Sequence, residues 1–119
     1  MIRAAASSIA NGRPSSCRQT AAIVAEEVSG RPKVVDLAAL EPGSDLDELI
    51  AWSHKQQAAA IAWVGHSPDV EHLTAALISA GDANLRFSKG AVAAIRMHSE
   101  LAAGSGELQW LVTLKALGA

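Results

Sequence analysis

Apolar residues recur along the chain with two different spacings, and these spacings predict alternating helices and strands. Apolar positions three to four residues apart, typical of a helix with one buried face, occur in three segments. Short apolar runs, typical of strands, occur in four others. The expected helices are residues 15–28, a segment beginning near residue 45, and a segment from residue 68 that ends by residue 81; the expected strands are residues 33–37, 58–64, 90–97 and 107–113.

Two of the helices carry local start signals. Ser44 precedes Asp45, with Asp47 three residues further on, which is a variant of the capping box. Ser67 is expected as the N-cap of the next helix, and Pro68 as its first residue, where proline is well tolerated. These signals therefore fix where both helices are expected to begin.

The run from residue 58 to residue 64 is apolar at almost every position and shows no alternation. A strand of this kind is expected in the centre of a parallel sheet that helices cover on both faces. The last two strands are separated by the glycine-rich segment 102–106, which suits a hairpin. Residues 1–18 are the least patterned, and within them only a turn at residues 11–14 is predicted. The fold class is therefore α/β, with a mainly parallel sheet flanked by helices.

Composition narrows the class of protein. The chain has 119 residues, a size that fits a single domain over residues 1–119, and half of them are apolar. The net charge is −2 and no basic stripe occurs, which argues against nucleic-acid binding. A single cysteine, Cys17, excludes an internal disulfide and fits a reducing compartment. Because neither a membrane-spanning run nor a signal-peptide centre is visible, a cytoplasmic location without membrane contact is expected.

The stretch from Gly65 to Asp69 is the first candidate for chemistry. Its glycine, histidine and serine match the first half of a nucleophile elbow, in which a serine lies on a strand-to-helix turn. The residue after that serine must donate its backbone N–H to the oxyanion hole, and Pro68 has no N–H. A serine hydrolase is therefore disfavoured.

His66 itself is a better candidate for a functional residue than Ser67. A histidine just past the carboxyl end of a parallel strand lies where open α/β sheets bind ligands. The following helix start favours an anion, and imidazole next to an anion suits phosphoryl transfer. The alternative is that His66 only occupies a turn. A metal site is disfavoured because His54, His72 and His98 show no ligand spacing with it.

Four blocks of the sequence resemble the histidine phosphatase superfamily, in particular its SixA-type phosphohistidine phosphatase branch. VGHSPD at residues 64–69 resembles the family's "VGHxPd" block, and RQTAAIVAEE at residues 18–27 resembles its "RxxQTAeivae" helix. Residues 85–93 and 106–110 resemble two late blocks. The blocks occur in the family's order and cover roughly residues 15–115.

The resemblance implies a three-layer, phosphoglycerate-mutase-like fold and the hydrolysis of a phosphohistidine protein or a phosphorylated small molecule, without a cofactor or metal. In the family, a histidine in an "RHG" motif attacks phosphorus, arginines hold the phosphoryl oxygens, and a second histidine contacts the same group. His66 corresponds to that second, catalytic histidine. Arg18, Arg13 and Ser67 are the candidate phosphate-binding residues.

The sequence also departs from the family. It has no "RHG", and no histidine precedes His54, so the nucleophile has no counterpart. The position of the family's arginine, three residues before Gln19, is Ser16. The strand and helix that precede this region in the family are expected to be absent. We therefore expect a chain that is incomplete at its N-terminus, either as a fragment or as a degenerate member.

These departures limit the expected activity. Without the nucleophile the domain is expected to be a weak or inactive phosphatase, and the alternative is a non-catalytic phosphate-binding or protein-interaction module. The missing strand is interior in the family's sheet, so its loss is expected to leave backbone groups unpaired on a neighbouring strand. The expected consequences are a sheet that closes up, a homodimer through the exposed sheet edge, or marginal stability.

Overall fold

The computed structural model describes residues 8–12, 15–27, 32–79 and 81–118. The chain forms two compact units, Met1–His66 and Ser67–Ala119, and each has its own secondary structure. The first unit contains a parallel sheet with helices, and the second contains a helix and a hairpin. The α/β class predicted from the sequence is therefore confirmed.

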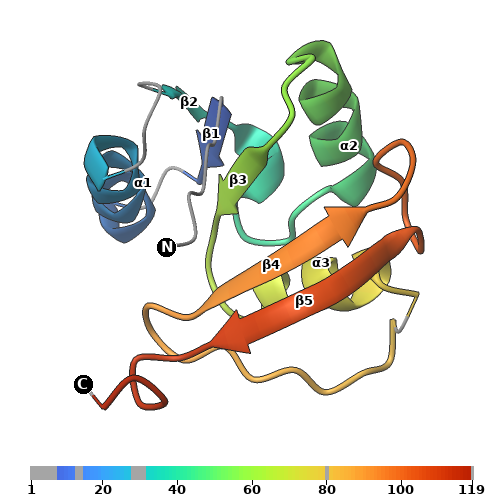
Figure 1. Cartoon of the computed structure of the whole chain (residues 1–119). Helices are drawn as coiled ribbons and strands as arrows, with labels where there is room; N and C mark the ends of the chain where they lie inside the picture. The colour runs from blue at the N-terminus through green and yellow to red at the C-terminus, as the bar shows by residue number, and fades with distance from the viewer. Residues whose placement is uncertain (1–7, 13–14, 28–31, 80, 119) are drawn as a thin grey trace. The chain divides into compact units, whose positions relative to one another are not determined.

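The sheet of the first unit has three parallel strands in the order β2-β1-β3. Its helix α1 follows β1, and its helix α2 precedes β3 (Figure 1). The strand positions are in direct register, so that the last residues of the three strands lie in one row across the sheet. The elements are β1 (Ser8–Asn11), α1 (Ser15–Glu27), β2 (Lys33–Asp36), the short 3₁₀ helix η1 (Ala38–Leu40), α2 (Leu46–Lys55) and β3 (Ile61–Val64).

A small core joins α1 to the sheet. Ile9 on β1 and Ala21 on α1 are completely buried, and Ala62 and Val64 on β3 pack against them. The small alanine side chains let the helix approach the strands closely. In Figure 1, α1 lies on one side of these strands and α2 on the other. On the α2 side, the Trp63 indole Nε1 donates a hydrogen bond to a hydroxyl of that helix.

The strand β1 corrects the expectation that no strand precedes the first helix. Ser8–Asn11 is buried at every position and forms the centre of the three-stranded sheet. This strand was not predicted because only two apolar residues stand between Ser8 and Asn11. Burial by two neighbouring strands and a helix outweighs the weak local preference.

The strand β3 is also not where it was expected. It is shorter than the predicted 58–64, and it lies at an edge of the three-stranded sheet rather than in its centre. All four of its residues are half-buried instead of fully buried. An apolar run predicts a strand, but it does not determine the order of strands in the sheet.

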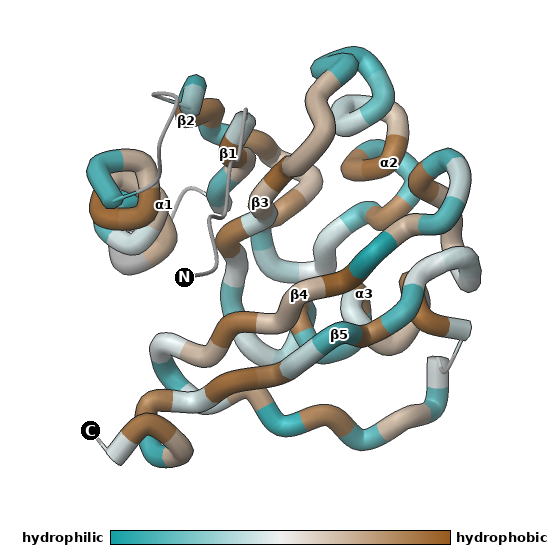
Figure 2. Tube along the Cα trace, in the orientation of Figure 1, coloured by the Kyte–Doolittle hydropathy of each residue, from teal (hydrophilic) through white to brown (hydrophobic). Residues whose placement is uncertain are grey.

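The second unit consists of α3 (Asp69–Leu77) and an antiparallel hairpin formed by β4 (Val92–Met97) and β5 (Gly106–Val112). The hairpin predicted at the glycine-rich segment is therefore confirmed. Its register shifts between Ala94 and Ile95, which marks a bulge. Figure 2 shows apolar colours along most of β4 and at the end of β5, with hydrophilic colours in the first half of β5.

The helix starts differ in detail from the predictions. Asp45, not Ser44, is the N-cap of α2, and its carboxylate accepts a hydrogen bond from the backbone N–H of Glu48. Helix α3 begins at Asp69, so Pro68 takes the N-cap position predicted for Ser67. The same helix ends at Leu77, before the predicted limit. Within the described ranges, no helix is long and apolar enough to cross a membrane.

Candidate functional site

The carboxyl edge of the three-stranded sheet gathers the polar residues of the first unit. Asp36, Asn11 and Val64 are the last residues of their strands and lie side by side in the sheet register. The chain passes from β1 to β2 on one side, and β3 lies on the other side of β1. The strand order thus reverses between β1 and β3, which is where open α/β sheets bind ligands.

The two strands at this reversal point are joined beyond their ends. The backbone N–H of Gly12 donates a hydrogen bond to the carbonyl of Val64, with an N–O distance of 3.1 Å. His66 follows two residues later, and its side chain is exposed. The imidazole of His66 is therefore carried at the carboxyl edge, next to the end of the central strand.

Asn11 organises the centre of this edge. Its side chain is completely buried, and its Nδ2 donates to the carbonyl of Gly12 at 2.8 Å and to Oδ1 of Asp36 at 2.9 Å. Its own Oδ1 is buried and has no hydrogen-bond partner among the described residues. The amide therefore fixes the β1 end and the Asp36 carboxylate relative to each other.

Arg18 joins the same group of residues from the first turns of α1. Its Nη2 donates to Oδ2 of Asp36 at 2.8 Å, and both side chains are about half exposed (53% and 50%). An ion pair this exposed contributes about 0–1 kcal/mol to stability. Because guanidinium has five N–H donors, Arg18 retains donors that could face an anion.

The other two predicted site residues, Arg13 and Ser67, do not join this group in the structure. Arg13 lies outside the described residues. Ser67 opens the second unit, and its hydroxyl donates a hydrogen bond to Oε2 of Glu71. Asp69 and Glu71 occupy the first turn of α3, where carboxylates compete with any external anion for the helix N-terminus. The structure thus brings His66 and Arg18 to one sheet edge and engages Ser67 with a carboxylate.

The histidines other than His66 lie elsewhere in their units. His54 is in the last turn of α2, which leads into the amino end of β3, opposite the carboxyl edge. His72 lies within α3, and His98 follows β4. Over the described ranges, no three histidine, cysteine or acidic side chains are arranged to hold a metal ion.

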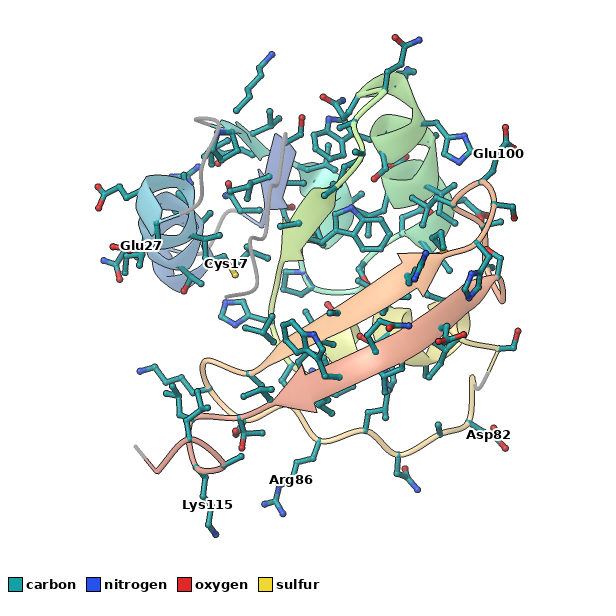
Figure 3. The ribbon with its side chains drawn as sticks, viewed as in Figure 1. Cys17, Glu27, Asp82, Arg86, Glu100 and Lys115 are labelled. Carbon is teal, nitrogen blue, oxygen red and sulfur yellow. The ribbon has the colours of Figure 1, made fainter. Side chains whose placement is uncertain are left out.

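Sequence reasoning missed Asn11 and Asp36. The only local signal at Asn11 was the Asn-Gly pair, which was interpreted as a turn. The hydrogen bond between these side chains joins residues 25 positions apart, so no local pattern reveals it. Cys17 is 3% exposed, and Figure 3 shows it on the side of α1 that faces the strands.

Comparison with known proteins found similarity to a solved structure but not to a family model. No family model matches the chain, and no curated protein matches it by sequence. A solved structure of the protein histidine phosphatase SixA complexed with tungstate is similar to it with a TM-score of 0.80 and 20% sequence identity. The match covers 96% of this chain and 72% of that chain. The chain therefore has the SixA-type, phosphoglycerate-mutase-like fold that its sequence motifs indicated.

Proposed function

We propose that the chain is a phosphatase-like domain whose carboxyl sheet edge receives the phosphoryl group of a phosphohistidine protein or a small phosphomonoester. The observation that supports this most directly is the position of His66, beside the strand-order reversal of a SixA-like fold. The SixA structure holds tungstate, a tetrahedral oxyanion of the same general shape as phosphate. In this proposal His66 acts as a proton donor or as a cationic contact.

Arg18 is the proposed oxyanion contact beside His66. Its bond to Asp36 uses Nη2, and the remaining guanidinium donors are suited to charge-assisted hydrogen bonds with phosphoryl oxygens. Asp36 also lowers the net positive charge that an incoming anion meets. Arg13 and Ser67 remain secondary candidates, and the Ser67 hydroxyl would first have to leave Glu71.

The proposed catalytic activity is weak or absent. A histidine that attacks phosphorus must lie in line with the leaving oxygen, beside the residues that hold the phosphoryl group. Of the two histidines in the first unit, only His66 lies at the carboxyl edge, and the resemblance gives it the supporting role. The proposal is therefore that the first unit supplies no nucleophilic histidine at this edge.

The test of weak activity is an assay of the purified chain. Hydrolysis of para-nitrophenyl phosphate and of a phosphohistidine protein is measured for the wild type, His66→Ala and His54→Ala. Because His54 lies at the opposite sheet edge, it provides the matched control. We expect all three to remain near the uncatalysed rate. Turnover that His66→Ala abolishes and His54→Ala preserves would show that the chain is an active phosphatase.

A non-catalytic phosphate-binding module is the second candidate. It is favoured by Arg18, whose bond to Asp36 uses Nη2 and leaves further N–H donors for an anion. It predicts phosphate or vanadate binding that depends on His66 without turnover. A pure interaction module predicts neither binding nor turnover, and a homodimer through a sheet edge belongs to that alternative. The proposed setting for all these candidates is the cytoplasm.

A further inference from the structure

Both oxygens of the Asp36 carboxylate accept hydrogen bonds at the carboxyl edge of the three-stranded sheet. Oδ1 accepts from Nδ2 of Asn11 at 2.9 Å, and Oδ2 accepts from Nη2 of Arg18 at 2.8 Å. Asn11 is completely buried, whereas Arg18 is exposed. The carboxylate therefore connects the interior of the first unit to the guanidinium of the proposed oxyanion contact.

The ends of β1 and β2 also hold the backbone of Asp36 in place. Asn11 and Asp36 are partners in the parallel register of these strands. The backbone N–H of Leu37 donates a hydrogen bond to the carbonyl of Asn11, with an N–O distance of 2.8 Å. Arg18 is therefore paired with a carboxylate whose own position is fixed through both its backbone and its side chain.

The stability of the fold gives little reason for this arrangement. The ion pair between Arg18 and Asp36 is about half exposed, and such pairs add little to the free energy of unfolding. The Oδ1 atom of Asn11 is buried without a hydrogen-bond partner among the described residues, which lowers the free energy of unfolding. The orientation that the amide gives to the ion pair is a better reason for its position than the stability of the pair.

The ion pair of the second unit provides a contrast. There His98 lies 3.0 Å from Oε2 of Glu107, and the other oxygen of that carboxylate accepts from Gln109. All three side chains belong to exposed residues. A surface ion pair of this kind has no anchor in the interior, whereas the pair at the carboxyl edge has one in Asn11.

We propose that Asp36, anchored by Asn11, is a positioning residue that orients Arg18 toward a phosphoryl group. This inference rests on the proposed phosphatase-like function, because it concerns the same site. Guanidinium is planar and carries five N–H donors in a rigid fork. Because the bond to Asp36 holds Nη2, it restricts the directions in which the remaining donors point.

A positioning role and a purely electrostatic role of Asp36 predict opposite effects on anion binding. A carboxylate close to the site repels an anion, so its removal alone should strengthen binding. An arginine that is already oriented loses less side-chain freedom when it binds an anion, so loss of the orienting carboxylate should weaken binding. The sign of the change therefore identifies the role.

Asp36→Asn separates the two hydrogen bonds of this side chain. The amide oxygen of the variant accepts from Asn11, so the buried donor keeps its partner. The amide nitrogen then faces Arg18, and it cannot accept a hydrogen bond from a guanidinium. The variant is therefore expected to stay folded, which circular dichroism verifies, while it releases Arg18.

The experiment measures the order of Arg18 and the affinity for inorganic phosphate separately. The heteronuclear NOE of the Arg18 Nε–Hε group reports its order, and Arg18→Ala assigns the resonance. The dissociation constant of phosphate is measured from the His66 side-chain resonances in about 0.15 M salt, where charge repulsion is partly screened. We expect Asp36→Asn to make the Nε–Hε group mobile and to raise the dissociation constant by about three- to tenfold.

Two controls separate positioning from general effects. Glu27→Gln removes one negative charge at the last residue of α1 (Figure 3), at the opposite end of the helix from Arg18, and should leave the dissociation constant unchanged. In an Arg18→Ala background, Asp36→Asn should not weaken binding further, because the side chain that it positions is gone.

Four results would overturn the proposal. A mobile Arg18 Nε–Hε group in the wild type would show that this side chain is not held. Unchanged or tighter phosphate binding in Asp36→Asn would leave Asp36 only its repelling charge. Equal weakening with and without the Arg18 side chain would show that Asp36 acts through the fold. A wild type that does not bind phosphate would refute the proposed function itself, whereas the first three results leave that function standing.

Discussion

Replacing the buried amide of Asn11 by a carboxylate tests the organisation of the carboxyl sheet edge. Asn11 is 0% exposed, and its Nδ2 is the donor in both of its hydrogen bonds, to Gly12 and to Asp36. Asn11→Asp keeps the shape and removes both donors. It also brings a second carboxylate next to that of Asp36. The variant should therefore destabilise the fold far more than its small change in size suggests.

The magnitude follows from two contributions. Each lost hydrogen bond costs about 1 kcal/mol, so the two together cost about 2 kcal/mol. Burial and the neighbouring Asp36 raise the pKa of the introduced carboxyl group, and a rise of about two units costs about 2.7 kcal/mol at neutral pH. The expected loss in free energy of unfolding is thus about 4–5 kcal/mol at pH 7.

The pH dependence of this loss has a definite sign. A carboxyl group whose pKa is higher in the folded than in the unfolded state destabilises the fold at any pH above its unfolded value. As the pH falls below that value, the group is protonated in both states and this part of the cost disappears. The difference between wild type and Asn11→Asp should therefore narrow by about half between pH 7 and pH 4.

The assay is urea unfolding followed by circular dichroism at both pH values. The matched control is the swap of Asn11→Asp with Asp36→Asn, which again places one amide opposite one carboxylate. The swap should recover at least about 1 kcal/mol relative to the sum of the single variants. An Asn11→Asp variant as stable as the wild type, or a swap without any recovery, would refute the role given to this amide.

Three further predictions concern other parts of the structure. Ile9→Ala removes a completely buried side chain from the α1 core and should lower the free energy of unfolding by about 2–5 kcal/mol in urea titration; a loss below that range would mean that the core collapses around the cavity. Trp63→Phe removes the hydrogen bond to the buried Ser53 and should lower the free energy of unfolding by about 1 kcal/mol, measured by urea titration with circular dichroism. An unchanged free energy of unfolding would mean that water replaces the indole as the partner of Ser53. In the hairpin, the hydrogen bond from His98, followed by that from Gln109, lowers the pKa of Glu107. Its stabilising effect is therefore present above the unfolded pKa and fades as the pH falls through the folded one. The protection factors of the hairpin amides, which compare each amide with its unprotected exchange rate at the same pH, should therefore fall on acidification in the wild type and less in Glu107→Gln. An equal fall of the protection factors in both proteins would contradict the assignment.

Much of the fold could be predicted from the sequence because the spacing of apolar residues within a segment indicates whether it forms a helix or a strand. The helix Ser15–Glu27, the strand Lys33–Asp36 and the final hairpin were all expected close to their observed bounds. The strand Ser8–Asn11 was missed because its burial comes from neighbours distant in the sequence. The edge position of β3 was missed for the same reason, since strand order is a property of the whole sheet.

The candidate site was predicted only in part. His66 was found because a glycine ends an apolar strand immediately before it, which is a local pattern. The connection of Asn11, Asp36 and Arg18 depends on β1 and β2 lying side by side, and no strand was predicted at β1. Ser67 was expected as a helix cap, but Glu71 one turn later offers its hydroxyl a charged acceptor.

The most direct test of the account is a titration of the chain with phosphate and with tungstate, followed by NMR of the four histidine side chains. His54 serves as the internal reference because it lies in the last turn of α2, which leads into the amino end of β3, opposite the carboxyl edge. We predict that the His66 resonances shift in a saturable manner while those of His54 stay nearly constant, and that Arg18→Ala weakens the binding. No shift at His66 with millimolar anion, or an equal shift at His66 and His54, would contradict a phosphoryl-binding site at this sheet edge.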